Sequence, residues 1–168
     1  MKDDAHLLAQ VAAGDEKAFA QLYDRFADRV FRYSFTILRD RHLAEEVTQE
    51  TMIAVWHGAK NYAGRARVST WILGIARNQA HRLLEKEIRA RRRIDEQLYL
   101  PDPAAAVGRE EAILRALSSL PDIQREVVFL TFYAGLSYPE IAEVLGIPEG
   151  TVKSRMFHAR KKLAEALR

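Results

Sequence analysis

Residues 137–163, SYPEIAEVLGIPEGTVKSRMFHARKKL, decide the fold of this chain because they predict two helices joined by a glycine turn. Ser137 and Glu140 form an S-x-x-E capping box at the start of the first helix. Gly146 supplies the tight turn that ends it. One apolar face of the second helix then comprises Val152, Met156, Ala159 and Leu163. This order is typical of a helix-turn-helix, whose second helix enters the major groove of DNA.

The opposite face of the second helix combines basic side chains with one aromatic ring, Phe157. An apolar ring on a polar helix face exposes area that gains from burial, so it needs a partner. A thymine methyl group or sugar edge in the major groove would cover the ring. The alternative is that Phe157 packs on the first helix of its own domain, and the sequence leaves both interpretations open.

Charge is strongly segregated along the chain, although the net charge is only +3. Residues 65–93 carry nine Lys/Arg against two acids, a balance of +7. Residues 94–150 carry three against ten, a balance of −7, and residues 151–168 carry six against one, a balance of +5. Segregation of this kind predicts two surfaces that meet a polyanion.

The hydrophobic pattern predicts an all-α protein of two small helical domains. Helical spacings run through residues 1–93 without a proline, which indicates a three- to four-helix bundle. Residues 94–108 contain two prolines, acids and small residues, and we interpret them as a flexible linker. Residues 109–168 form the second domain, with helices at about 109–119 and 122–134 before the helix-turn-helix.

A second nucleic-acid surface is predicted where the glycine-containing loop 60–70 meets the basic stretch that follows it. Single-stranded bases are held by aromatic stacking, by hydrogen bonds to their edges and by cations along the phosphates, and this stretch offers all three. Trp71 is in phase with Ile72 and Ile75, so we expect a core residue rather than a stacking platform.

Composition limits the classes of function. The 168 residues, 48% of them hydrophobic, are sufficient for packed cores, and the absence of cysteine excludes disulfides and thiolate metal sites. The acidic N-terminal start and the lack of long apolar runs predict no export signal and no membrane insertion, so we expect a cytoplasmic protein. Nucleotide-binding and hydrolase motifs are missing and the five histidines are scattered. We therefore expect no enzyme, no catalytic residue, no metal and no cofactor.

Four blocks in register resemble one family. They are AFAQLYDRFADRVFRY, LAEEVTQETMIAVW, VSTWILGIARNQA and LPDIQREVVFLTFYAGLSYPEIAEVLGIPEGTVKSRMFHARKKL. In their order and spacing the chain resembles the extracytoplasmic-function (ECF) sigma factors of bacterial RNA polymerase, which keep only regions 2 and 4 of the sigma-70 family. The resemblance implies a dissociable subunit that directs core polymerase to promoters and helps to open them, commonly under the control of a cognate anti-sigma factor.

The resemblance also implies residue roles. The −35 element would be read as duplex by Thr151, Lys153, Ser154, Arg155, Phe157, His158 and Lys161. Unstacked −10 bases would be held by Asn61, Tyr62, Arg65, Arg67, Arg77 and Asn78. The clamp helices of the polymerase β′ subunit would be met by Glu45, Glu46, Gln49 and Glu50, which periodicity alone would assign to a solvated helix face. The surface of about 110–136 would sit on the β flap.

Two departures from the family pattern limit what the resemblance implies. Arg82 and Glu85 exchange the usual acid and base, so a role of Arg82 in contacting DNA does not carry over. His158 stands where relatives often carry Arg, so the promoter sequence cannot be transferred from a relative. Two other classes remain open on the residues alone. A stand-alone, dimeric duplex-binding regulator would explain the helix-turn-helix, and an RNA-binding or adaptor module would explain the basic surfaces.

Overall fold

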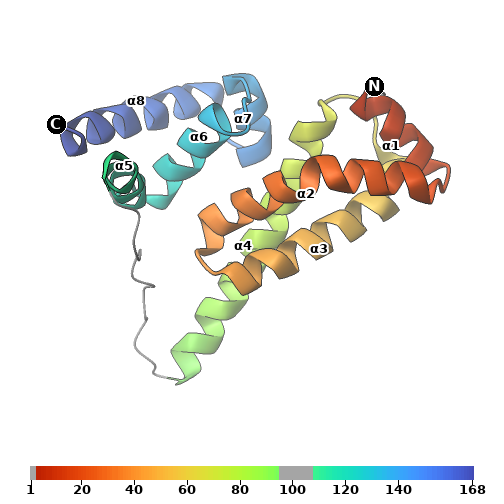
Figure 1. Cartoon of the computed structure of the whole chain (residues 1–168), viewed down its shortest axis with the longest axis horizontal. Coiled ribbons are helices and arrows are strands. Elements are labelled where there is room, and N and C mark those ends of the chain that lie inside the picture. Colours follow the sequence, from red (N-terminus) through yellow and green to blue (C-terminus); the bar gives the residue numbers. More distant parts are fainter. Residues whose placement is uncertain (1–2, 95–107) are drawn as a thin grey trace.

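The computed structural model describes residues 3–94 and 108–168, and every regular element in those ranges is helical (Figure 1). The helices are α1 (Asp4–Ala12), α2 (Glu16–Leu38), α3 (Arg41–Gly58), the short 3-10 turn η1 (Ala59–Asn61), α4 (Val68–Ile94), α5 (Arg109–Ser118), α6 (Asp122–Phe132), α7 (Tyr138–Leu145) and α8 (Glu149–Ala166). The all-α prediction is confirmed. The predicted linker lies, from residue 95 to 107, outside the described residues. None of the described helices is both long and apolar enough to cross a bilayer.

Helices α1–α4 form the N-terminal module. Aspartate side chains cap the helix starts, because Asp15 accepts hydrogen bonds from the backbone of Lys17 and Ala18, and Asp40 accepts one from Leu43. The long α2 buries one face against α3 and α4. The predicted bundle of three to four helices is therefore present as four.

Helices α5–α8 form the C-terminal module. The connection between α5 and α6 is held by Arg125, which donates hydrogen bonds to the carbonyls of Leu117, Ser118 and Leu120. The capping box between Ser137 and Glu140 is present in both directions, and Gly146 ends α7 in the left-handed region at φ 64°. The predicted apolar face of α8 is confirmed, since Val152, Met156 and Ala159 are buried and Leu163 packs against the core.

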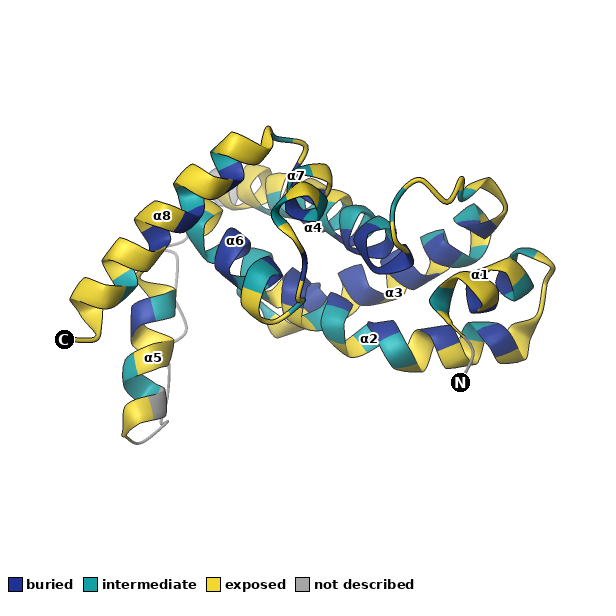
Figure 2. Cartoon of the chain, turned by 90° about the horizontal axis from the view of Figure 1, so that it is seen from above, coloured by how far each residue is buried: buried dark blue, intermediate teal, exposed yellow. Residues whose placement is uncertain are grey.

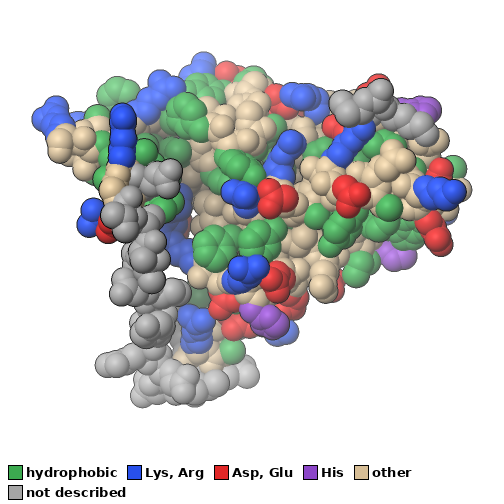
Figure 3. Space-filling view, viewed as in Figure 1, with side chains coloured by type: hydrophobic (Ala, Val, Ile, Leu, Met, Phe, Trp, Pro, Cys, Tyr) green, Lys and Arg blue, Asp and Glu red, His purple; other side chains and the backbone are tan. Residues whose placement is uncertain are grey.

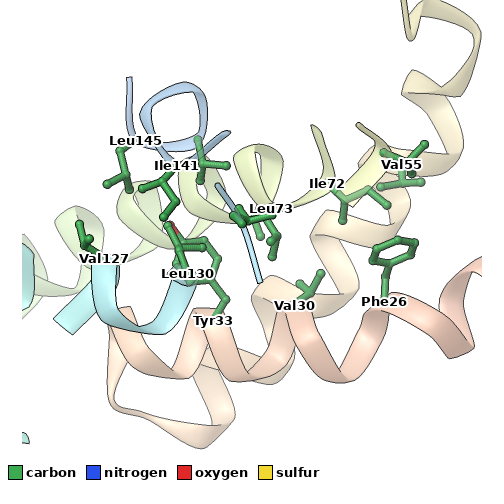
Figure 4. Packing of buried hydrophobic residues seen from close by; sticks show 14 of the residues in the cluster. Phe26, Val30, Tyr33, Val55, Ile72, Leu73, Val127, Leu130, Ile141 and Leu145 are labelled. Atoms are coloured by element: carbon green, nitrogen blue, oxygen red, sulfur yellow. The ribbon is translucent and has the colours of Figure 1, made fainter. Parts of the chain in front are cut away.

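The two modules share one hydrophobic core. Helix α2 packs on α6 and α4 packs on α7, and we call this contact the seam (Figures 1 and 2). In Figure 4, Tyr33 and Leu73 of the N-terminal module meet Leu130 and Ile141 of the C-terminal module within one cluster. These four side chains are completely buried. Opening the seam would therefore expose apolar area to water.

Neighbouring residues of α8 provide a test of its two faces. Met156→Ala should lower the free energy of unfolding by about 2–5 kcal/mol, because it removes a fully buried side chain and leaves a cavity. Phe157→Ala should change it by less than about 0.5 kcal/mol, because the ring is exposed. Urea unfolding followed by circular dichroism measures both. Equal losses for the two variants would contradict the observed orientation of α8.

Candidate nucleic-acid interface

The outer face of α8 presents the residues predicted for duplex DNA. Lys153, Ser154, Phe157, His158 and Lys161 are exposed, whereas Thr151 and Arg155 are half-buried. Phe157 is 66% exposed, so the alternative that it packs on the first helix of its own domain is wrong. Its ring contacts that of His158 edge-on, with 5.5 Å between the centroids. Figure 3 shows basic side chains along the edge that α8 forms.

The loop before α4 is closed by its own contacts. The Tyr62 hydroxyl donates a hydrogen bond to the carbonyl of Ala66, and the Tyr62 ring lies 5.2 Å from that of Trp71. Both rings pack against the core, as predicted for Trp71. Asn61, Arg65 and Arg67 are exposed around this fixed loop. The loop is thus held by its own contacts and carries exposed polar side chains on its rim.

Arg77, predicted to face DNA, lies instead in the seam. Its Nε donates to Oε1 of Glu126 at 2.9 Å, and the Tyr33 hydroxyl donates to the same oxygen at 2.5 Å. The Glu126 side chain is only 6% exposed. Burial, and then the charge of Glu126, raise the pKa of Tyr33 well above its ordinary value, so the phenol keeps its proton. Asn78, one position further along α4, remains exposed.

Glu140 is the second carboxylate of the seam. It accepts a hydrogen bond from the Thr70 hydroxyl at 2.9 Å and lies 3.5 Å from Nη1 of Arg67, while it also caps α7 through Ser137. Burial alone would raise its pKa. The hydrogen bonds from Ser137 and Thr70, together with the charge of Arg67, outweigh burial, and the pKa of Glu140 is lowered.

The sequence predictions missed the roles of Glu126 and Glu140. A signal for Glu126 does exist, because it precedes the apolar run VVFL on the face that α6 buries. A charged residue in that position indicates a partner from another element. No signal in the sequence identified that partner as Arg77.

The outer face of α3 is acidic and open. Glu45, Glu46, Gln49 and Glu50 are all exposed, while Ala44, Val47, Thr48 and Thr51 turn inward. Glu46 and Glu50 line a shallow groove between α3 and α4 together with Arg82 and Lys86. The face is accessible to a protein partner.

Exposed apolar side chains occur on the first two helices of the C-terminal module. Ile113 and Leu114 lie on α5, and Ile123 and Phe132 lie on α6. All four belong to the surface of about 110–136 that the sequence predicts to sit on the β flap.

Taken together, these surfaces define a helix-turn-helix protein with a second basic face. A family model described as "Sigma-70 region 2" matches residues 22–93, and one described as "Sigma-70, region 4" matches residues 110–163. Curated relatives agree. An "ECF RNA polymerase sigma factor SigK" from Mycobacterium sp. (strain KMS) is 34% identical, over 89% of this chain and 83% of its own. An "ECF RNA polymerase sigma factor SigK" from Mycobacterium ulcerans (strain Agy99) is 32% identical, over 96% of this chain and 91% of its own.

This chain therefore belongs to the ECF RNA polymerase sigma factors of the sigma-70 family.

Solved structures of similar fold contain both modules. CnrH in complex with the cytosolic domain of CnrY matches with a TM-score of 0.73 at 27% identity, covering 98% of this chain and 96% of that chain. The sigma factor RpoE of Bartonella quintana, in complex with the anti-sigma factor NepR, has the same fold, with a TM-score of 0.74 at 24% identity over 90% and 97%.

The seam also contains His81 of α4, whose Nε2 is buried without a hydrogen-bond partner. Burial, and then the charge of Arg77, lower the pKa of His81; opposing contributions come from Glu126, Glu85 and Asp122. When the pKa of a group is lower in the folded state than in the unfolded chain, acid protonates the unfolded chain first and so favours unfolding. The free energy of unfolding is therefore unaffected by His81 above pH 6.5, the ordinary value, and it falls as the pH drops below that value.

We therefore expect the free energy of unfolding of the wild type to decrease between pH 7.5 and pH 5.5, and this decrease to be smaller in His81→Gln. Urea unfolding at about five pH values in this range measures the slope for each chain. His158→Gln serves as the control, since His158 is exposed and outside the seam. Equal slopes for the wild type and His81→Gln would show that His81 does not carry the effect.

Proposed function

We propose that this chain binds core RNA polymerase in the cytoplasm, directs it to specific promoters and assists the melting of the −10 element, without catalysing a reaction itself. Residues 1–93 act as the region 2 domain, 94–108 as the linker and 109–168 as the region 4 domain. The observation that carries the proposal is the exposed Phe157, surrounded by donors on the second helix of a helix-turn-helix.

The −35 element is read by α8 in the major groove. Lys153, Ser154, Arg155 and His158 reach base edges and phosphates, and Phe157 covers an apolar base edge. Thr151 and Lys161 lie at the two ends of this face and fix the register through the phosphates. Gly146, in the left-handed region, forms the turn between α7 and α8 that a helix-turn-helix needs.

The −10 element is held as a single strand by the loop and the start of α4. Asn61, Arg65 and Arg67 project from the loop rim, and Tyr62 fixes the loop. Arg77 and Asn78 continue the surface along α4. Cationic and amide donors beside aromatic rings suit unstacked bases and their phosphates.

Two protein surfaces engage the polymerase. Glu45, Glu46, Gln49 and Glu50 of α3 meet the clamp helices of the β′ subunit, and the apolar surface of α5 and α6 sits on the β flap. A third partner is an anti-sigma factor. Support for it comes from CnrH, whose structure in complex with the cytosolic domain of CnrY matches nearly the whole of this chain.

Co-elution with sigma-free bacterial core polymerase, followed by run-off transcription from a library of promoter fragments, tests the proposal. New transcripts that depend on the added chain are expected. A folded chain that neither co-elutes with active core nor yields transcripts would overturn the proposal and favour a stand-alone regulator.

Substitutions on α8 should distinguish side chains that recognise bases of the −35 element from side chains that contact its phosphates. Phe157→Ala or Arg155→Ala should weaken promoter use by about 1–3 kcal/mol at particular bases of the −35 element. Lys161→Ala should weaken all promoters alike and flatten the dependence on salt, because it removes a phosphate contact. Transcription from −35 variants at several salt concentrations measures both. Uniform loss in Phe157→Ala would remove its reading role.

Charge reversal on α3 should weaken polymerase binding. Glu46→Lys and Glu50→Lys together should lower the affinity for core polymerase at least about tenfold, because unlike charges at an interface become like charges. Asp24→Lys, at an exposed position of α2, is the control for charge on another face. Fluorescence titration of labelled chain with core measures the affinity. A loss as large in Asp24→Lys would show a general charge effect.

A further inference from the structure

Two side chains that the proposed function assigns to DNA are engaged in the seam. Arg77 is bound to Glu126, and Arg67 is paired with Glu140, which also accepts a hydrogen bond from Thr70. Both carboxylates belong to the C-terminal module, and all three donors belong to α4 and the loop before it. Two acids of the C-terminal module thus meet donors from the loop and helix that carry the basic stretch of 65–93.

A carboxylate and a phosphodiester offer the same chemistry to these donors. Each presents anionic oxygens that accept charge-assisted hydrogen bonds from a guanidinium. The Nε of Arg77, which donates to Glu126 at 2.9 Å, cannot donate to a phosphate at the same time. Access is also limited, because the Arg77 side chain is only 24% exposed.

In the closed state, the two proposed DNA-binding surfaces also lie too close together to reach both promoter elements. The contact between Thr70 and Glu140 ties the start of α4 to α7. From Glu140 to Phe157 the chain, helical except for the turn, spans at most about 35 Å. By their numbering the −10 and −35 elements lie about 25 base pairs apart, which is about 85 Å of duplex at about 3.4 Å per base pair. One closed chain therefore cannot occupy both elements.

We propose that Glu126 and Glu140 act as internal substitutes for DNA phosphates, which hold the two modules closed and occupy Arg67 and Arg77 of the −10 surface until polymerase and promoter separate them. This inference rests on the proposed function. It goes beyond it because the inhibitory groups are part of the same chain.

The carboxylates provide selectivity, and the apolar core of the seam provides much of its free energy. Leu130 and Ile141 are completely buried in the closed state, and the free energy gained from burying apolar area does not depend on the charge of the carboxylates. Neutral glutamine keeps nearly the same shape and still accepts a hydrogen bond, but it competes less well with a phosphate for a guanidinium. Glu126→Gln and Glu140→Gln therefore change the competition with little change in packing.

The opening of the seam can be followed by energy transfer. The chain contains no cysteine, so Ala63→Cys in the loop and Ala164→Cys near the end of α8 provide two exposed labelling positions. The unlabelled chains are titrated separately with a fluorescein-labelled single-stranded oligonucleotide of mixed sequence. In the variant with both Glu126→Gln and Glu140→Gln we expect lower transfer efficiency and an affinity for this oligonucleotide raised about fivefold or more.

Glu16→Gln together with Asp24→Asn is the matched control. It removes the same number of charges at exposed positions of α2, and neither carboxylate is a partner of the seam donors Arg67, Thr70 and Arg77. An affinity increase as large in this control would mean that net charge alone is responsible and would overturn the proposal. Unchanged transfer efficiency in the double variant would also overturn it.

Two further measurements keep the outcomes distinct. If circular dichroism shows that Glu126→Gln has lost its fold, Glu140→Gln decides alone, since this carboxylate is partly exposed and lies at the rim of the seam. Core-dependent run-off transcription by the wild type reports on the proposed function separately. If the wild type supports transcription but the seam variants do not differ from the control, the proposed function stands and the internal competition is rejected. If the wild type supports no transcription and the variants also do not differ, both proposals are rejected.

Discussion

The buried carboxylate of Glu126 is the interaction on which the arrangement of the molecule depends. Removing a carboxylate from water is unfavourable by several kcal/mol unless donors replace the lost hydration. Here the donors are the Tyr33 hydroxyl of α2 and the guanidinium of Arg77 on α4. Because the acceptor lies on α6, this one cluster fixes the position of the C-terminal module against two helices of the N-terminal one.

The buried cluster of Glu126, Arg77 and Tyr33 also determines how readily the seam opens and closes again. A seam made only of leucine and isoleucine would tolerate small sliding motions and would resist separation in every environment. A buried ion pair adds direction, since it requires Arg77 and Glu126 to meet at 2.9 Å. It adds less net stability, because water or a phosphate solvates the same groups once the modules part. Such an interface is well suited to two discrete states.

Local structure was predictable from the sequence, and the seam was not. The capping box, Gly146 and the helices predicted at about 109–119 and 122–134 depend on neighbours in sequence, and the observed α5 and α6 agree within about two residues at each end. Tyr33 and Glu126 are 93 positions apart. The family resemblance assigned Arg77 to the −10 surface, and periodicity cannot distinguish a helix face that meets solvent from one that meets another module.

The match to CnrH bears on how a second protein would hold this chain, provided that the seam acts as proposed. The match covers 98% of this chain, so it extends over both modules, and the CnrH structure contains the cytosolic domain of CnrY. A partner of this chain need not create a closed arrangement that the seam already stabilises; it only has to bind that arrangement more tightly than the open one. Any free energy that Glu126 and Glu140 contribute to closure is free energy that the partner does not have to supply. By the same linkage, the proposed binding to core polymerase would have to favour the open state over the closed state by at least the free energy of the seam.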